Sequence, residues 1–323
     1  MALRVIDRET VRALLPYEAC IPLMREAMMA LSAGRTRQLL RQIIDLGEAA
    51  LFGVMPGAME QTFGAKLIGV SPPSAEGVQS HRGVVALFDA RTGAPIAILH
   101  AGELTAIRTA AASAAATEVL ARPEAHRVAI LGTGEQARAH AVAMSKVRPV
   151  TQIMVWGRNP ERAEALAARL HAQLAITILT APTVQAAVRE SDIICTTTGA
   201  AEPILQDRWV GDGTHINLVG SSRAGPREID DDLVVRARFI ADHREGVLRQ
   251  GAEYLHARDA GLIGEGHVVA EIGQVMSGQR PGRTAPSEVT IYKSLGSIVQ
   301  DLAAGWFVYQ AAVAQGRGVD AEF

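Results

Sequence analysis

The sequence predicts an α/β protein in which a Rossmann-type, doubly wound parallel sheet is joined to a second domain of α+β type. Residues 126–242 alternate short apolar strands with helices, which is typical of a parallel sheet. Residues 38–98 instead carry short apolar runs between Gly and Pro clusters, which indicates antiparallel hairpins. The 323 residues suffice for two domains. We expect one domain over 1–120, completed by a C-terminal helix over 296–323, and the Rossmann domain over 121–295.

The expected α+β domain begins with a helix over residues 8–34, whose apolar residues recur at helical spacing until Gly34 ends it. An alanine-rich helix over 103–121 ends at Arg122-Pro123. A last long helix, over about 288–315, is expected to return to this domain. Between the first two helices we expect strands at 51–55, 64–70, 83–89 and 94–99, with turns at Ser71-Pro72-Pro73 and Gly93-Ala94-Pro95.

The Rossmann domain is predicted from strands and helices that follow one another at short, regular intervals. Its expected strands are 126–131, 152–156, 175–179, 192–197, 215–219 and 239–242, and its expected helices are 135–147, 160–171 and 184–189.

Composition excludes several classes of function. A net charge of −2 gives no electrostatic reason to expect nucleic acid or an anionic membrane as partner. No apolar run approaches the roughly 18 residues of a membrane span, and the charged residues 1–12 do not resemble a secretory signal. Cys20 and Cys195 are too few and too far apart for a disulfide framework. The nine histidines form no metal-binding pattern, so we expect no metal. Because the sequence has few cysteines and neither a membrane span nor a secretory signal, we expect a cytoplasmic location.

A glycine-rich turn follows the first Rossmann strand and opens the next helix. It reads GxGxxA, in which the first glycine permits the tight turn and the second lets the backbone approach a pyrophosphate. The helix that follows offers free N–H groups and a positive dipole to the phosphates. The motif therefore predicts a dinucleotide site, because the strand, the helix and the complete βαβ unit are all present. Its expected cofactor contacts are Gly132, Thr133, Gly134, Glu135, Gln136 and Ala137.

The end of the second Rossmann strand bears on the choice of cofactor. An acidic residue at this place would bind the ribose 2′-hydroxyl of NAD(H). The chain has Gly157-Arg158-Asn159 here and no carboxylate. Since a guanidinium suits a 2′-phosphate, Arg158 favours NADP(H), while NAD(H) stays possible.

Further motifs extend over nearly the whole chain, and with them it resembles the ornithine cyclodeaminase and mu-crystallin family. The resemblance implies a homodimer, with a substrate-binding and dimerisation domain built from the N-terminal region and the C-terminal helix. It also implies a small α-amino or α-imino acid as substrate. The motifs are residues 104–111 (LTAIRTAA), the glycine turn, Met55-Pro56-Gly57, 63–66 (FGAK), 217–220 (NLVG), Pro281-Gly282-Arg283 and 292–296 (YKSLG).

Three cationic residues stand where the family places its substrate contacts: Arg41, Lys66 and Arg108. An arginine fork suits a substrate carboxylate, while the ammonium of Lys66 can also donate a proton. Arg108 and Thr109 are expected to contact the cofactor as well, and an arginine near a helix start opposes the helix dipole, which favours a functional role.

The loop after Val219-Gly220 is expected to reach the reacting centre. In ornithine-cyclising members this loop presents an aspartate, and Ser222 occupies its place here. A serine hydroxyl is a poor base but can form hydrogen bonds. The Ser222-Arg223 pair is instead similar to the ketimine reductase branch of the family. Thr198, Val219 and Ser294 complete the expected cofactor contacts.

These observations predict an NAD(P)-dependent enzyme that reduces a small cyclic imino acid, or interconverts an amino acid with its imino or keto acid, by hydride transfer. One alternative is a lyase, ornithine cyclodeaminase, which forms proline and ammonia with bound NAD. A second alternative is a binding protein without catalysis. Retention of Arg41, Lys66 and Arg108 together argues against the latter.

Overall fold

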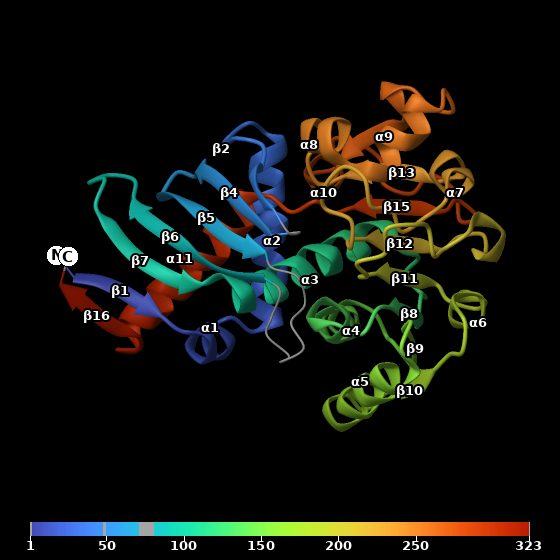
Figure 1. Ribbon diagram of the computed structural model, residues 1–323, viewed down its shortest axis with the longest axis horizontal. Helices are drawn as coiled ribbons and strands as arrows, with labels where there is room; N and C mark the ends of the chain where they lie inside the picture. The colour runs from blue at the N-terminus through green and yellow to red at the C-terminus, as the bar shows by residue number, and fades with distance from the viewer. Residues whose placement is uncertain (1, 48–49, 71–80, 323) are drawn as a thin grey trace. The chain divides into compact units, whose positions relative to one another are not determined.

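The computed structural model describes residues 2–47, 50–70 and 81–322 (Figure 1). These residues form two compact units. Unit 1 comprises Met1–Arg108 and Ser297–Phe323, and unit 2 comprises Thr109–Gly296. The division falls within helix α3 (Ala101–Leu120), whereas the sequence placed it after this helix.

Unit 1 contains a mostly antiparallel sheet in the order β16-β1-β7-β6-β5-β4-β2, with β3 paired to β4. Only β1 and β7 pair in parallel among the described strands of this sheet. The antiparallel pairing expected for residues 38–98 is therefore confirmed, although the turn at Ser71-Pro72-Pro73 lies outside the described residues. The strands are β1 (Ala2–Ile6), β2 (Arg37–Gln38), β3 (Gln42–Gly47), β4 (Ala50–Ala58), β5 (Thr62–Val70), β6 (His81–Asp89), β7 (Pro95–His100) and β16 (Val319–Glu322).

The helix expected over 8–34 is in fact two helices, α1 (Arg8–Leu14) and α2 (Tyr17–Ser32). Pro16 separates them, because proline disfavours helical backbone in the residue before it and lacks an N–H for a preceding helix. Pro16 is the N-cap of α2, and the Asp7 side chain caps α1 by accepting a hydrogen bond from the Thr10 N–H. The expectation of one continuous helix was wrong.

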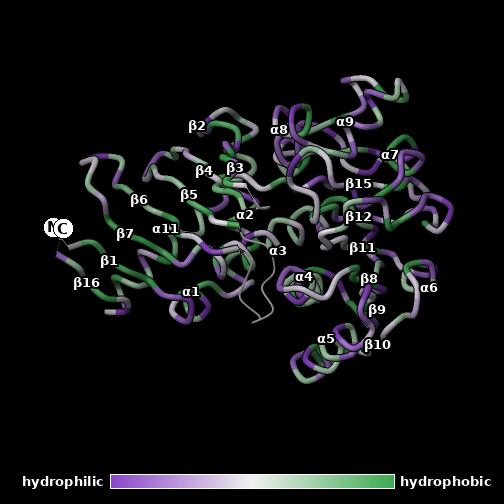
Figure 2. The backbone as a smooth tube through the Cα atoms, in the orientation of Figure 1, coloured by the Kyte–Doolittle hydropathy of each residue, from purple (hydrophilic) through white to green (hydrophobic). Residues whose placement is uncertain are grey.

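The last helix, α11 (Ile298–Ala314), packs against β4, β5 and β6 and against α2. Gly57 allows this close packing, because a Cβ there would lie 2.5 Å from the Ile298 side chain of α11. Gly64 is needed within the sheet instead, because a Cβ there would clash with the Ala86 carbonyl oxygen of β6. In Figure 2, β5, β6 and β7 are mostly coloured as hydrophobic, consistent with a core between this sheet and α11.

Unit 2 contains a parallel sheet in the order β10-β9-β8-β11-β12-β15-β13-β14. Every pair of neighbouring strands in it is parallel, which confirms the Rossmann-type fold class. The strands are β8 (Arg127–Leu131), β9 (Gln152–Trp156), β10 (Thr177–Thr180), β11 (Ile193–Thr196), β12 (His215–Leu218), β13 (Arg238–Ala241), β14 (Val268–Glu271) and β15 (Thr290–Lys293).

The segment before α11 departs from expectation. Residues 288–297 were expected to be helical, but Thr290–Lys293 is strand β15 in the sheet of unit 2. Thr290, Ile291 and Tyr292 are β-branched or aromatic and suit a buried strand. Gly296 then adopts a φ of +82°, and the Ser297 side chain caps the start of α11. The helices of unit 2 are α4 (Glu135–Val147), α5 (Pro160–Gln173), α6 (Val184–Val188), α7 (Asp231–Arg236), α8 (Arg244–Gln250), α9 (Ala252–Asp259) and α10 (Ile272–Met276).

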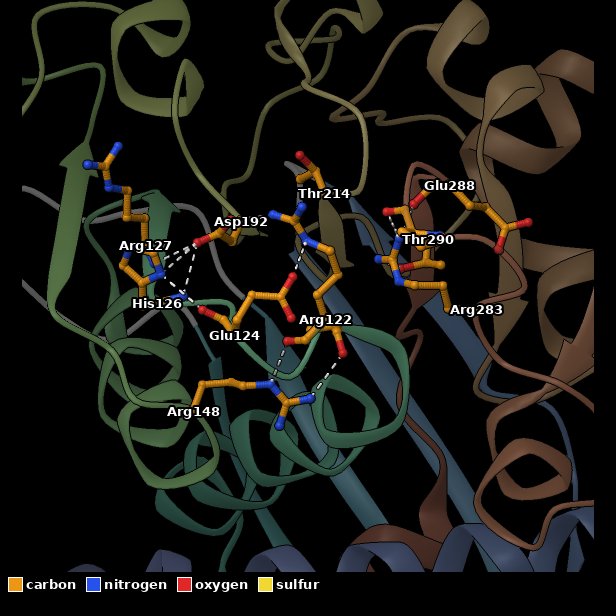
Figure 3. Close-up of polar contacts among 12 residues, drawn as sticks. Arg122, Glu124, His126, Arg127, Arg148, Asp192, Thr214, Arg283, Glu288 and Thr290 are labelled. Carbon is orange, nitrogen blue, oxygen red and sulfur yellow. Dashed lines mark hydrogen bonds and ion pairs between the residues drawn. The ribbon is translucent and has the colours of Figure 1, made fainter.

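A polar cluster joins the amino ends of several strands of unit 2 to the end of α3 (Figure 3). Asp192 accepts hydrogen bonds from the backbone of His126 and Arg127 and pairs with Arg122 at 2.6 Å. The Arg148 guanidinium donates to backbone carbonyls in the last turn of α3 and just beyond it. Arg283 donates to the Leu120 carbonyl, so this residue of a family motif has a structural role. Ligands of such sheets bind at the opposite, carboxyl edge.

Candidate active site

The glycine turn between β8 and α4 has the geometry that a dinucleotide requires. Gly132 has a φ of +133°, and a Cβ there would lie 2.8 Å from the Thr197 carbonyl oxygen. At Gly134 a Cβ would meet no heavy atom within 4 Å, so the space above the turn is open. Gly134 is also the N-cap of α4 and provides no side-chain cap. The first N–H groups of α4 are therefore available to a pyrophosphate, and the turn fits a nicotinamide dinucleotide.

The neighbouring residues of the turn divide into packing and exposed positions. Ala137 is fully buried in α4, which brings the helix close to the sheet. Thr133 packs against Gly157, where a Cβ would clash with the threonine methyl. Arg158 follows β9, is exposed, and has no side-chain partner among the described residues. Its guanidinium is thus open to a ligand. Glu135 and Gln136 are partly exposed in the first turn of α4.

The other expected cofactor residues of unit 2 lie near carboxyl ends of parallel strands or in α3. Val219 follows β12, and Ser294 follows β15, where its N–H donates to the Leu218 carbonyl. The side-chain oxygens of Ser294 and of Thr109 in α3 are buried and have no hydrogen-bond partner among the described residues. Because an unsatisfied buried hydroxyl is costly, both are suited to a bound ligand.

Thr198 differs from the expectation in one respect. Its N–H and its hydroxyl both donate to Glu228 Oε1, each at 2.7 Å. The hydroxyl proton of Thr198 is therefore committed to a protein carboxylate.

The loop that follows β12 carries Ser222, which is partly exposed. The two residues before Ser222 are held by buried groups: Gly220 N–H donates to Glu228 Oε2 at 2.7 Å, and Lys293 Nζ lies 2.6 Å from Ser221 Oγ. The sequence reasoning missed Glu228, and it recognised Lys293 only as part of a motif. For Lys293 the available signal was a single charge in an otherwise uncharged segment, whereas Glu228 lies in the charge-rich segment 227–232 and had no such signal.

In unit 1, two of the three predicted cations meet. Lys66 in β5 and Arg108 in α3 contact the same oxygen, Asp301 Oδ1 in α11, at 3.1 Å from Nζ and 3.0 Å from Nε. All three side chains are at most 3% exposed. Lys66 also donates to Thr105 Oγ1 at 2.5 Å, and Arg108 donates to Gln300 Oε1 at 2.5 Å. Two buried positive charges thus share one negative charge, which favours an additional anion.

Burial lowers the pKa of Lys66 to about 8. The positive charges of Arg108 and Arg41 act in the same direction, and Asp301 opposes them. Arg41, between β2 and β3, is partly buried and close enough to influence this ammonium. A lysine with this pKa can exchange a proton near neutral pH.

Asp301 is the residue of this cluster that sequence reasoning missed. It is fully buried in the first turn of α11, and its Oδ2 has no hydrogen-bond partner among the described residues. A single acid in the otherwise apolar start of the helix was the signal that could have identified it.

The fold and the site together define an oxidoreductase that uses a nicotinamide dinucleotide. The chain belongs to the ornithine cyclodeaminase/mu-crystallin family, whose model matches residues 3–316. The family predicted from the motifs is thereby confirmed.

Three similar proteins refine this comparison. A Delta(1)-pyrroline-2-carboxylate reductase of Bacillus cereus is 32% identical over 99% of both chains. The ketimine reductase mu-crystallin of Mus musculus is 35% identical over 86% of both chains. The solved structure of Thermococcus litoralis Delta(1)-pyrroline-2-carboxylate reductase, in complex with NADH and L-proline, has a TM-score of 0.96 and 31% identity, and the alignment covers 99% of this chain and 100% of that chain.

Proposed function

We propose that the protein reduces a small cyclic imino acid to the corresponding cyclic amino acid, with NADPH as hydride donor. The observation that carries this proposal is the buried cluster of Lys66 and Arg108, which both contact one carboxylate oxygen of Asp301. Their two positive charges exceed its one negative charge, so the cluster can bind a second carboxylate. The names of the similar reductases, which act on pyrroline-2-carboxylate and on ketimines, support the same substrate class.

Each residue of the cluster receives a role from its chemistry. Arg108 and Arg41 bind the substrate carboxylate, because guanidinium groups form paired hydrogen bonds with carboxylates. Lys66, with its pKa lowered to about 8, is mostly protonated at pH 7 and delivers a proton to the substrate nitrogen. A nicotinamide dinucleotide held at the glycine turn would supply a hydride for the imine carbon. Addition of this hydride and one proton converts the C=N bond into an amine, which balances the reaction.

Ser222 is proposed to orient the substrate nitrogen through a hydrogen bond. A cyclodeaminase needs a base to deprotonate the substrate amine, and a serine hydroxyl near its ordinary pKa is a poor base. This substitution disfavours ornithine cyclisation, which remains the alternative function.

The proposed preference for NADPH depends on Arg158. The residue is exposed at the end of β9, and its charge is available to a 2′-phosphate. Residues 155–159 contain no acid that would bind an unmodified ribose.

A matched pair of assays tests the proposed function. One follows oxidation of NADPH and NADH at 340 nm with pyrroline-2-carboxylate or piperideine-2-carboxylate. The other measures proline and ammonia formed from ornithine in the presence of NAD. Oxidation of NADPH by a cyclic imino acid, without proline formation from ornithine, is the expected result. Proline and ammonia with no net change in dinucleotide would establish the lyase instead.

We further propose that the protein is a homodimer in the cytoplasm. All residues of β3 are exposed in the single chain, including Ile43, Ile44 and Leu46. Apolar side chains gathered on one strand are typical of an interface. Both cysteines are buried free thiols, which is compatible with a reducing compartment.

A further inference from the structure

A second buried charged cluster in unit 2 lies at the carboxyl ends of β11, β12 and β15. It consists of Glu228, Glu253 and Lys293, and each of these residues is 0% exposed. The cluster has no place in the roles proposed so far. Two carboxylates and an ammonium removed from water carry a large desolvation cost, so their arrangement calls for a physical explanation.

Glu228 joins two strand ends through four hydrogen bonds. Its Oε1 accepts from the Thr198 N–H and hydroxyl, both at 2.7 Å, on the segment that follows β11. Its Oε2 accepts from the hydroxyl of Thr196, the last residue of β11, at 2.6 Å. The same oxygen accepts from the Gly220 N–H at 2.7 Å, on the segment that follows β12. One carboxylate therefore fixes the spacing of these two segments.

Glu253 and Lys293 hold the next residue of the same loop. Lys293 Nζ donates to the Ser221 carbonyl at 2.7 Å and contacts Ser221 Oγ at 2.6 Å. Glu253 accepts a hydrogen bond from the Ser221 hydroxyl, pairs with Lys293 at 2.7 Å, and accepts from the Glu228 N–H at 3.2 Å. The two carboxylates and the lysine are thus one connected network.

The bonds converge on Gly220 and Ser221, which directly precede Ser222. We propose that Glu228 is a positioning residue for reduction: with Glu253 and Lys293, it sets the place of the 220–222 segment and hence of the Ser222 hydroxyl. This inference rests on the role proposed for Ser222. An offset of about 1 Å in such a group can cost about a hundredfold in rate, so a rigid buried anchor has a functional reason.

The geometry identifies Glu228→Gln as the informative variant. Each carboxylate oxygen accepts from a backbone N–H, at Thr198 or at Gly220, and neither N–H can reverse its direction. A glutamine would direct its NH2 group at one of these donors in either orientation. The variant keeps the size of the side chain and displaces one of the two segments.

The experiment measures kcat and KM for a cyclic imino acid, the Kd for NADPH by fluorescence, and the Tm. We expect Glu228→Gln to lower kcat about 10- to 100-fold, with the KM for the imino acid within about threefold of wild type, because Glu228 takes no part in the carboxylate-binding cluster. The matched control is Glu190→Gln, a 69% exposed glutamate paired with Arg127, and it should leave kcat unchanged.

A double-mutant cycle separates positioning from general destabilisation. If Glu228 acts through Ser222, Glu228→Gln should lower kcat much less in a Ser222→Ala background than in wild type. Independent effects, in which the two losses multiply, would overturn the proposal. Ser221→Ala, which removes the contact of this side chain with Glu253 and Lys293, provides the same cycle if Glu228→Gln does not fold.

The wild-type protein distinguishes the failure of this inference from the failure of the proposed function. Absence of imino-acid reduction by wild type would reject the proposed function, and with it the role of Glu228 in reduction. Wild-type activity together with an unchanged kcat in Glu228→Gln and in Ser221→Ala would reject the positioning role alone.

Discussion

The role proposed for Lys66 combines substrate binding with proton transfer in a single buried residue. Its ammonium is held by Asp301 and Thr105, while burial lowers its pKa to about 8. An ordinary lysine pKa of about 10.4 would make proton release slow and uphill at neutral pH. The shared carboxylate of Asp301 keeps the ammonium charged in a place where burial alone would favour the neutral amine.

The proton state of Lys66 predicts opposite pH dependences for the two directions of the reaction. Below pH 8 the lysine is protonated and can donate, so kcat for reduction should be constant there and fall about tenfold per pH unit above it. Oxidation of the amino acid requires Lys66 in its neutral form, which can accept a proton. The kcat for oxidation should therefore rise up to about pH 8 and then level off. Initial rates from pH 6 to 10, at saturating substrate, measure both profiles.

Lys66→Arg tests the assignment directly. Arginine keeps the positive charge but does not release a proton, so KM should change little while kcat falls about a hundredfold or more and the break near pH 8 disappears. Lys146→Arg, at an exposed position of α4, is the control. A pH 8 break that persists in Lys66→Arg would assign it to another group.

Arg158 carries a separate prediction on cofactor choice. Arg158→Gln should lower kcat/KM for NADPH about 10- to 100-fold, because a charge-assisted hydrogen bond is worth about 1.5–3 kcal/mol. The value for NADH should stay within about twofold, since NADH has no 2′-phosphate. Steady-state kinetics with both cofactors checks this, with Arg162→Gln on the exposed side of α5 as control. An equal loss for both cofactors would contradict phosphate recognition by Arg158.

At the scale of elements, we expect the β8–α4 turn to contain one glycine needed for folding and another needed for cofactor binding. Gly132→Ala should lower the free energy of unfolding by about 1–3 kcal/mol, because residue 132 has a φ of +133° and a Cβ there would contact the Thr197 carbonyl. Gly134→Ala has free space and an extended φ of −86°, so its Tm should stay within a few degrees. Its methyl group would instead occupy the approach of the pyrophosphate and raise the Kd for NADPH at least about tenfold. Thermal denaturation and fluorescence titration with NADPH test the two variants. Equal effects of Gly132→Ala and Gly134→Ala on Tm would contradict the different roles expected for these glycines.

Local signals determined how much of the fold could be predicted. Helix α4 and strand β9 have the residue limits expected from the sequence, because a glycine turn and short apolar runs define them. Residues 290–293 are predicted to be helical but form a strand, because a short apolar segment has no clear period and its neighbours in the sheet are distant in sequence. The break at Pro16 has a local signal, because proline disfavours helical backbone in the residue before it.

The same reasoning applies to the site. Lys66 and Arg108 are predicted as site residues because each lies in a recognisable motif. Asp301 lies 235 residues from Lys66 in sequence and becomes its partner only through the packing of α11 on β5. Glu228 likewise accepts hydrogen bonds from two backbone N–H groups at the ends of separate strands. No local sequence pattern predicts these contacts.

At the scale of the whole molecule, two buried histidines of unit 2 make stability depend on pH. Burial lowers the pKa of His140 to about 4 and that of His215 to about 3. Since the unfolded chain takes up protons near pH 6.5 and the folded chain does not, stability is full above pH 6.5 and falls as the pH drops toward 4. Each histidine costs about 1.4 kcal/mol per pH unit in this interval.

His140→Gln isolates one of these contributions. His140 Nδ1 donates to the Gln136 carbonyl and Nε2 accepts from Ser113, so the variant should be less stable at pH 7.5. Its free energy of unfolding should then fall less steeply than that of wild type between pH 6.5 and 4.5. Urea denaturation at several pH values measures the difference, in which all other titrating groups cancel. Parallel pH profiles would show that His140 is not protonated on unfolding.

The exposed apolar strand β3 makes the oligomeric state the last prediction. Ile44 is 56% and Leu46 63% exposed in the single chain, and burying side chains of this size gains about 1.5–3 kcal/mol each. The wild-type protein should therefore have twice the 34.3 kDa mass of one chain in light scattering. Ile44→Lys should reduce the mass to that of one chain, because an ammonium in the proposed interface would be desolvated without a partner. Leu179→Lys, at an exposed leucine of β10 in unit 2, should remain dimeric. A dimer that survives Ile44→Lys would place the interface on another surface.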